Sequence, residues 1–245
     1  MMKIIFIQMK IELTKRPKNC ILIEGFPGFG LVSTITTEFL IDHLKAEQIG
    51  KILLSGKMSP MVAVHNNKIV DPLGVFYDKQ NNLIILHALT GVNGLEWEIV
   101  EAVNDLCKML DIKEVIGLEG VGTVGGMGEK SGAYFYSKDS KKWNSLGIPP
   151  LKEGVVVGVT GALLLNLKGP KLSCVFTETK SNLPDSRAAA KMIEVLDNYL
   201  GLNVDYKPLL KKAVEFENKL KGILDQTKQA SIQKLKRNRD VDYVG

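Results

Sequence analysis

Residues 20–30 read Cys-Ile-Leu-Ile-Glu-Gly-Phe-Pro-Gly-Phe-Gly, and a helical pattern follows over residues 31–44. The run begins with four apolar residues, as a short buried strand does. A glycine-rich turn comes next. Apolar residues then recur at helical spacing at Leu31, Ile35, Phe39, Leu40 and Leu44. A strand, a tight turn and a helix in this order predict the opening unit of an α/β fold.

The chain up to residue 207 continues to alternate strand and helix patterns, which predicts one α/β body over residues 1–207 without an internal repeat or linker. Strands are expected at 3–13, 49–55, 61–64, 83–89, 113–118 and 172–177, and helices at 94–110, 139–146 and 184–200. Asn66-Asn67 and Asn81-Asn82 are typical of hairpin turns. Pro184-Asp185 begins the last of these helices and Gly201 ends it.

Residues 208–245 are expected to form a long C-terminal helix and a mobile basic tail. Pro208 begins the helix, whose apolar positions are Leu209, Ala213, Phe216, Leu220 and Ile223. This near-heptad stripe predicts packing on the body or on a partner helix. The region holds nine Lys/Arg and five Asp/Glu, whereas the rest of the chain holds 23 and 22, for a net charge of +5. The tail could contact an acidic partner, RNA or a membrane, although such runs are more often solvated helix faces.

The nearly neutral body argues against a broad nucleic-acid surface, which needs clustered positive charge. No apolar run reaches the roughly 20 residues that span a bilayer. The first residues have neither the length nor the cleavage site of an export signal, so a cytoplasmic location is expected. Cys20, Cys107 and Cys174 lie in apolar surroundings and are expected to be buried free thiols.

The sequence contains no recognisable catalytic or metal-binding motif. His43, His65 and His87 fall on different expected elements, and no cysteine pair has metal-ligand spacing. No Gly-x-Ser-x-Gly turn presents a nucleophile. Glu96 and Glu98 are two residues apart and would point away from each other on a helix. We therefore expect no metal, no cofactor and no catalytic residue, that is, a protein that is not an enzyme.

Two glycine-rich loops are the candidate ligand sites. The first carries Gly25, Gly28 and Gly30 between a strand and a helix, where free amides and the helix dipole favour phosphate. Its glycines stand at positions 1, 4 and 6, not 1, 3 and 6 as in the dinucleotide fingerprint, and Pro27 removes an amide donor. The second loop reads Gly-Glu-Lys-Ser around Lys130, and its glutamate would repel phosphate. A tight turn is the favoured interpretation of the first loop.

Four motifs together resemble one family. They cover residues 24–32, 117–120, 159–164 and 183–190 and read Glu-Gly-Phe-Pro-Gly-Phe-Gly-Leu-Val, Gly-Leu-Glu-Gly, Val-Thr-Gly-Ala-Leu-Leu and Leu-Pro-Asp-Ser-Arg-Ala-Ala-Ala. Their order and spacing resemble the archaeal homologues of the second proteasome-assembly chaperone, a family sometimes labelled ATP-grasp-like. The resemblance covers about residues 18–220.

This resemblance implies a three-layer α/β/α sandwich similar to nucleoside phosphorylases, a likeness of fold that carries no activity with it. It also implies homo-oligomers, here a ring of four or five subunits. Proteasome-binding members of the family assist core-particle assembly or dock on its α-ring. They dock through a C-terminal tail that ends in a hydrophobic residue, a tyrosine and one final residue.

The C-terminal tail of this chain departs from that pattern. It ends Val-Asp-Tyr-Val-Gly, so Tyr243 is third from the end and Asp242 precedes it. One extra residue moves the terminal carboxylate by about 3.5 Å. This displacement argues against α-ring docking in the family manner and leaves open a role as an adaptor for another client.

The sequence therefore predicts a homo-oligomeric, chaperone-like scaffold whose partners are further copies of itself and either proteasome α subunits or another protein. The residues expected to contact the partner are Lys234, Lys236, Arg237, Arg239 and Tyr243. One alternative is a nucleotide- or nucleoside-binding enzyme that uses the Gly25–Gly30 loop with Lys130 near the phosphate. Another is an RNA-binding role for the basic tail.

Overall fold

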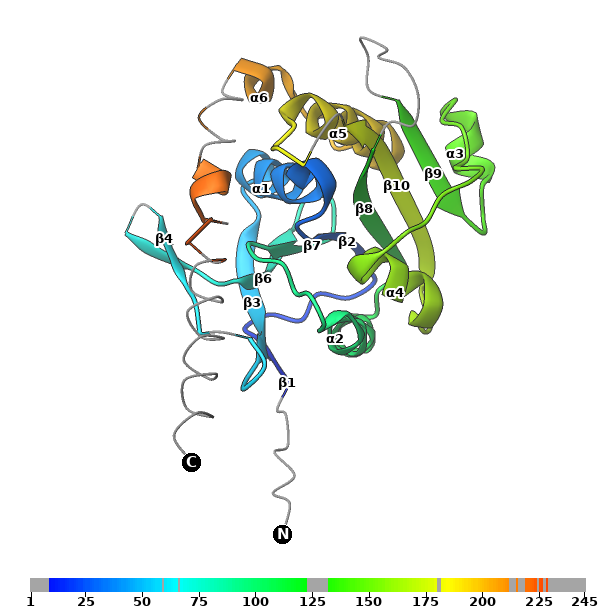
Figure 1. The fold of residues 1–245 in the computed structure, drawn as a ribbon. Coiled ribbons are helices and arrows are strands. Elements are labelled where there is room, and N and C mark those ends of the chain that lie inside the picture. The colour runs from blue at the N-terminus through cyan, green and yellow to red at the C-terminus, as the bar shows by residue number, and fades with distance from the viewer. Residues whose placement is uncertain are drawn as a thin grey trace, which may run out of the picture.

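A computed structural model of the chain describes most of its residues. The described residues are 9–58, 60–65, 67–122, 132–179, 182–211, 215, 219–223, 225–226 and 228. An eight-stranded mixed sheet lies between two layers of helices (Figure 1). This arrangement confirms the expected three-layer α/β/α sandwich.

The strands of the large sheet follow one another in the order β1 (Met9–Leu13), β3 (Glu47–Leu54), β6 (Leu73–Asp78), β7 (Leu83–Ala88), β2 (Ile21–Gly25), β8 (Glu114–Gly122), β10 (Lys171–Thr179) and β9 (Ala133–Ser137). The four central strands β7, β2, β8 and β10 are parallel. The outer strands on both sides pair antiparallel. Two short strands, β4 (Ala63–His65) and β5 (Lys68–Val70), form a separate hairpin that projects from the body (Figure 1).

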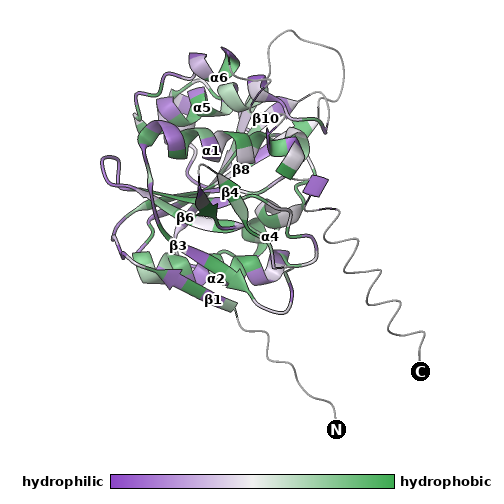
Figure 2. Cartoon of the chain, turned by 90° about the vertical axis from the view of Figure 1, so that its left-hand side faces the viewer, coloured by the Kyte–Doolittle hydropathy of each residue, from purple (hydrophilic) through white to green (hydrophobic). Residues whose placement is uncertain are grey.

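Helices cover both faces of the sheet (Figures 1 and 2). One layer consists of α1 (Val32–Leu44), α5 (Ser186–Leu200) and the short α6 (Lys207–Lys211). The other contains α2 (Glu96–Leu110) and α4 (Gly158–Asn166), and α3 (Lys141–Ser145) lies beside β9. Because neighbouring residues of a strand point to opposite faces, Ile23 joins the core under α1 and Leu22 the core under α2. The parallel centre is thus buried on both sides.

Most of the expected elements are present. The turn at Asn81-Asn82 joins β6 to β7, and Asn82 has a φ of 50°. Asp185 caps α5 by accepting hydrogen bonds from the backbone N–H groups of Arg187 and Ala188, and Gly201 ends the helix at a φ of 73°. The sequence interpretation missed the strands β5, β6 and β9 and assigned no type to the segment that forms α4. The three cysteines are buried free thiols, as expected.

The described part of the C-terminal region packs on the α1 layer. Leu220 is buried in the core under α1 and α5. Lys219 Nζ lies 2.8 Å from Glu38 Oε1 of α1. The expected long helix is described only as α6 and as short pieces up to residue 228, so the division at residue 207 stays a prediction. Residues 229–245, with all five expected partner contacts, lie outside the described residues.

A buried polar network ties the β8 and β10 strands to α5. The carboxyl group of Glu114 accepts hydrogen bonds from Ser173 Oγ at 2.6 Å and from Tyr199 Oη at 3.0 Å. The indole of Trp143 donates to Ser173 Oγ at 3.2 Å and stacks on the Tyr199 ring at 3.8 Å. Each polar group therefore has a partner, as burial requires.

Replacing Tyr199 with phenylalanine removes one donor from the buried Glu114 carboxyl and leaves the ring stacking in place. We expect Tyr199→Phe to lower the free energy of unfolding by about 1–3 kcal/mol in urea denaturation. Tyr136→Phe on β9, where the side chain is 41% exposed, is the matched control and should change it by less than about 0.5 kcal/mol. Equal changes in the two variants would contradict the role of the network.

Candidate functional site

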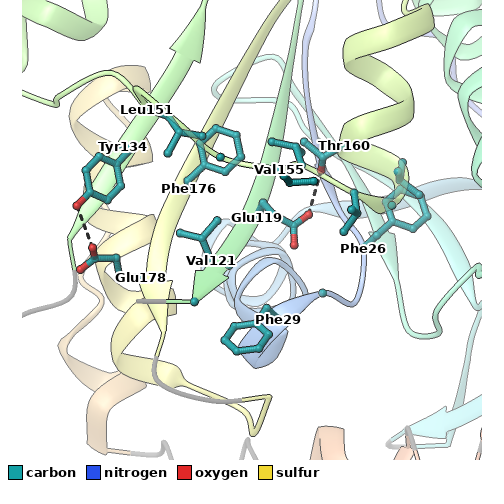
Figure 3. Close-up of a pocket in the computed structure, with 18 of the residues that line it drawn as sticks. Phe26, Phe29, Glu119, Val121, Tyr134, Leu151, Val155, Thr160, Phe176 and Glu178 are labelled. Atoms are coloured by element: carbon teal, nitrogen blue, oxygen red, sulfur yellow. Dashed lines mark hydrogen bonds between the residues drawn. The ribbon is translucent and has the colours of Figure 1, made fainter. Parts of the chain in front are cut away.

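A large cavity lies at the carboxyl ends of β2, β8 and β10, on the face that α2 and α4 cover (Figure 3). Its volume is about 1110 Å³. β2 leads into α1 on one face of the sheet, whereas the chain after β8 returns through α4 on the other face. Ligand crevices in open α/β sheets form at such a point, where the connections diverge. The fold alone therefore marks this cavity as the candidate site.

The cavity wall combines aromatic rings, carboxylates and one irregular segment. The 149–157 segment is held beside β9, because Leu151 N donates to Phe135 O at 2.8 Å. The aromatic rings belong to Phe26, Phe29, Tyr134 and Phe176. The ionisable side chains in the lining, apart from the tyrosine, are Glu96, Glu119, Lys152, Glu153 and Glu178. Among the described residues the lining thus carries four carboxyl groups and one ammonium group, so it is acidic.

A pair of carboxyl groups joined by a threonine lies at the floor of the cavity, with one of the two exposed to it. Glu24 lies near the end of β2, Glu119 lies in β8, and Thr160 lies in the first turn of α4. Thr160 Oγ1 is 3.2 Å from Glu24 Oε1 and 3.2 Å from Glu119 Oε2 (Figure 3 draws the second contact). Glu24 is completely buried, and its Oε2 atom has no hydrogen-bond partner in the described part of the chain. Glu119 is partly exposed and lines the cavity.

The environment of this pair favours the protonated form. Burial, and then the neighbouring Glu119 carboxyl, raise the pKa of Glu24 to about 8. Burial also raises the pKa of Glu119 to about 7, against hydrogen bonds from Thr160 and the Phe29 backbone N–H. A hydroxyl group has one proton to donate, so Thr160 can bridge both carboxyl groups only if one of them donates to it. The three side chains together therefore hold a carboxyl proton at neutral pH.

The glycines of the candidate ligand loop make room for protein atoms. A Cβ on Gly28 would overlap Glu119 Oε1, and a Cβ on Gly25 would lie 2.7 Å from Ser33 O. Gly30 has a φ of 66°, and its Cβ would lie 2.6 Å from Thr179 Oγ1. Packing thus accounts for all three glycines, which supports the favoured interpretation of a tight turn.

The Gly25–Gly30 loop borders the cavity mainly with aromatic rings and not, as the nucleotide-binding alternative expected, with its glycines. Of its glycines only Gly28 lines the cavity, together with the rings of Phe26 and Phe29. Lys130, the expected phosphate neighbour, lies outside the described residues. The acidic lining would repel phosphate. The geometry therefore does not favour the nucleotide-binding alternative.

Sequence inspection missed the carboxyl pair, although its members lie within motifs that were singled out. Glu24 ends an apolar strand, Glu119 follows Gly117-Leu118, and Thr160 opens the Val-Thr-Gly motif. The available signal was a glutamate inside an otherwise apolar, central strand, because a buried glutamate needs a partner. Which residue would be that partner depends on the order of the strands, which the sequence did not reveal.

A second cluster joins β7, α1 and the C-terminal region. His87 Nδ1 lies 2.8 Å from Thr37 Oγ1, and His87 Nε2 lies 3.1 Å from Glu38 Oε2. Burial alone would raise the pKa of Glu38, but contacts with His87 and Lys219 lower it to about 2. His87 and Thr37 are almost completely buried. We interpret this cluster as a structural anchor, because it ties β7 and α1 to the C-terminal region.

The comparisons with known proteins agree with the fold. Residues 22–224 match the model of the PAC2 family, and the chain belongs to this family. The crystal structure of Pyrococcus furiosus PbaA, an archaeal homolog of proteasome-assembly chaperone, superposes with a TM-score of 0.81 at 32% identity, over 91% of this chain and 100% of that one. The expected family resemblance is therefore confirmed.

Two further relatives support the assignment. Pyrococcus furiosus PbaB, an archaeal proteasome activator, has a TM-score of 0.72 at 23% identity over 88% of this chain and 98% of its own, which shows the shared fold. The uncharacterized protein MJ0106 of Methanocaldococcus jannaschii is 27% identical over 214 residues, 85% of this chain and 87% of that protein. In the described residues, no helix is long and apolar enough to cross a membrane.

The buried Glu24 carboxyl should make stability fall as the pH rises. Below its ordinary pKa of 4.5, the group is protonated in both the folded and unfolded states. Between about 4.5 and 8, only the folded state keeps the proton, so each step up in pH favours unfolding. Glu24→Gln removes this penalty. We expect the variant to gain about 2–4 kcal/mol relative to the wild type between pH 5 and pH 8.5.

Urea denaturation of both proteins across this pH range measures the effect. Glu47→Gln, at an exposed position of β3, serves as the control and should run parallel to the wild type. A constant difference between Glu24→Gln and the wild type at all pH values would show that Glu24 titrates alike in both states.

Proposed function

We propose that this protein is a homo-oligomeric, chaperone-like scaffold that binds protein partners through its C-terminal region and carries out no catalytic step. The observation that carries the proposal is membership of the PAC2 family together with the match of nearly the whole chain to PbaA. In the proposal, the protein works in the cytoplasm as a ring of four or five subunits. Its client is a proteasome α subunit or another protein.

The β4–β5 hairpin supports self-association. Val64 and Ile69 form a cross-strand pair and are 70% and 65% exposed. Val62, just before β4, is 51% exposed. A two-stranded hairpin is marginally stable alone in water. We infer that this apolar face contacts a neighbouring subunit.

The charge of the C-terminal tail supports partner binding. Lys234, Lys236, Arg237 and Arg239 lie within six residues, close to Tyr243. The chain before them is anchored on the body by the buried Leu220 and by the Lys219–Glu38 ion pair. In an oligomer, each subunit would contribute one such tail. Several tethered tails raise the effective concentration for a multimeric client without any new contact.

Native mass spectrometry of the purified chain tests self-association. We expect a tetramer or pentamer for the wild type. The double variant Val64→Asp/Ile69→Asp should shift the dominant species to the monomer, because burying two unpaired carboxylates at an interface is unfavourable. Leu165→Asp on α4, a side chain that is 77% exposed, controls for the loss of an apolar surface residue elsewhere. A monomeric wild type, or an unchanged oligomer in the double variant, would contradict the proposal.

Mixing the chain with proteasome α subunits tests the role of the tail. We expect the full-length oligomer to retain a partner protein that the variant lacking residues 229–245 loses, with the oligomer itself unchanged. Capture of α subunits would identify an assembly factor. If the oligomer ignores α subunits and instead retains a different protein from a cell lysate through the tail, the protein is an adaptor, in agreement with the displaced Tyr243. A truncated chain that keeps every partner of the full-length chain would rule out the tail.

A further inference from the structure

The cavity at the carboxyl ends of β2, β8 and β10 has features that a protein scaffold does not require. Its volume of about 1110 Å³ lies slightly above the range for small-molecule sites, about 300–1,000 Å³. It lies on the α2/α4 side of the sheet, whereas the C-terminal region packs on the α1 side. A ligand site here would therefore go beyond the proposed function.

The chemistry of the lining indicates which ligand would fit. Glu119 presents a carboxyl group at the floor, held by Thr160 and by the backbone N–H of Phe29. Glu178 lies further along the wall and accepts hydrogen bonds from Tyr134 Oη at 2.9 Å and Gly132 N at 3.0 Å (Figure 3). Both carboxyl groups are thus fixed in position by other contacts before any ligand arrives.

Aromatic rings complete the arrangement. The Phe29 ring and the floor carboxyl of Glu119 both border the cavity, and Phe26 and Tyr134 add further rings (Figure 3). Carboxylates favour a cation that donates hydrogen bonds, and ring faces attract the same cation and pack against its apolar part. Among the described residues of the lining, an anion would meet four glutamates and one lysine.

We propose that this cavity binds an organic cation, an ammonium, amidinium or guanidinium group on an apolar body, with Glu119 as its anchor. The buried Glu24 carboxyl supports this role of Glu119. Glu24 holds a proton on the side of Thr160 away from the cavity, so Glu119 is the carboxyl group that faces the ligand. The same chemistry is found in free amines and in the lysine and arginine side chains of peptides. The enclosing 149–157 segment and the position of Glu119 at the floor favour a free small molecule.

Three probes of the same shape and different charge test the proposal on the full-length chain. Benzamidine is a cation, benzamide is neutral and benzoate is an anion. Ligand-observed NMR titration should give a dissociation constant for benzamidine at least about tenfold lower than for the other two, as expected for one charge-assisted hydrogen bond. Equal binding of benzamide or benzoate, or no binding of benzamidine, would overturn the proposal.

Two variants assign the binding to this cavity. Glu119→Gln keeps the shape of the side chain, and we expect it to weaken benzamidine at least about tenfold. Phe29→Leu keeps the charge and the backbone N–H, and should weaken benzamidine by about threefold or more. Glu101→Gln, exposed on α2, should leave the affinity unchanged. Unaltered binding to both cavity variants, with their unfolding temperatures showing that they are folded, would refute the assignment.

A short peptide distinguishes the two sources of the cation. If acetyl-Gly-Arg-Gly-amide competes with benzamidine, the natural ligand is a side chain of a protein; if only free amines compete, it is a small molecule. Native mass spectrometry of Glu119→Gln separates this inference from the proposed function. The variant should keep the oligomer and the captured client while it loses the cation.

Discussion

The turn at Gly25–Gly30 packs so closely on β8 that both segments need glycine at their points of contact. Gly28 leaves space for the Glu119 carboxyl, and on β8 a Cβ at Gly120 would overlap Phe29 O. This close approach sets the position of α1 on one face of the sheet, and it turns the rings of Phe26 and Phe29 toward the cavity on the other. The layer order, the floor of the cavity and the path of the helix all depend on it.

The same approach explains why the carboxyl pair is unusual. Gly117 leaves room for Glu24, since a Cβ there would lie 2.9 Å from Glu24 Oε1. A buried carboxyl with one unpartnered oxygen lowers stability at neutral pH, because the folded state must hold a proton that the unfolded state would release. An apolar side chain at this position of a central strand would avoid that penalty. The pair therefore fits a ligand site better than it fits the needs of the fold.

Local patterns were enough to predict much of the fold. The apolar run before Glu24, the Asp185 cap and the Gly201 stop are signals within a few residues, and the structure has a strand and a helix where they indicate. The site could not be derived in this way. Glu24, Glu119 and Thr160 meet only because β2 and β8 are neighbours and α4 returns over them, a consequence of strand order. The charge of the cavity, which disfavours phosphate at the glycine loop, is likewise a property of the assembled fold.

Helix α1 connects the cavity with the anchor of the C-terminal region. Its first residues follow the glycine turn, and Glu38, at its centre, forms an ion pair with Lys219. Transmission of a signal along this path would require α1 to have two positions. The described contacts give α1 one closely packed position, since a Cβ on Gly25 would already lie 2.7 Å from Ser33 O. A cation in the cavity would therefore leave the anchor in place, so ligand binding and partner capture should be independent properties of one rigid body.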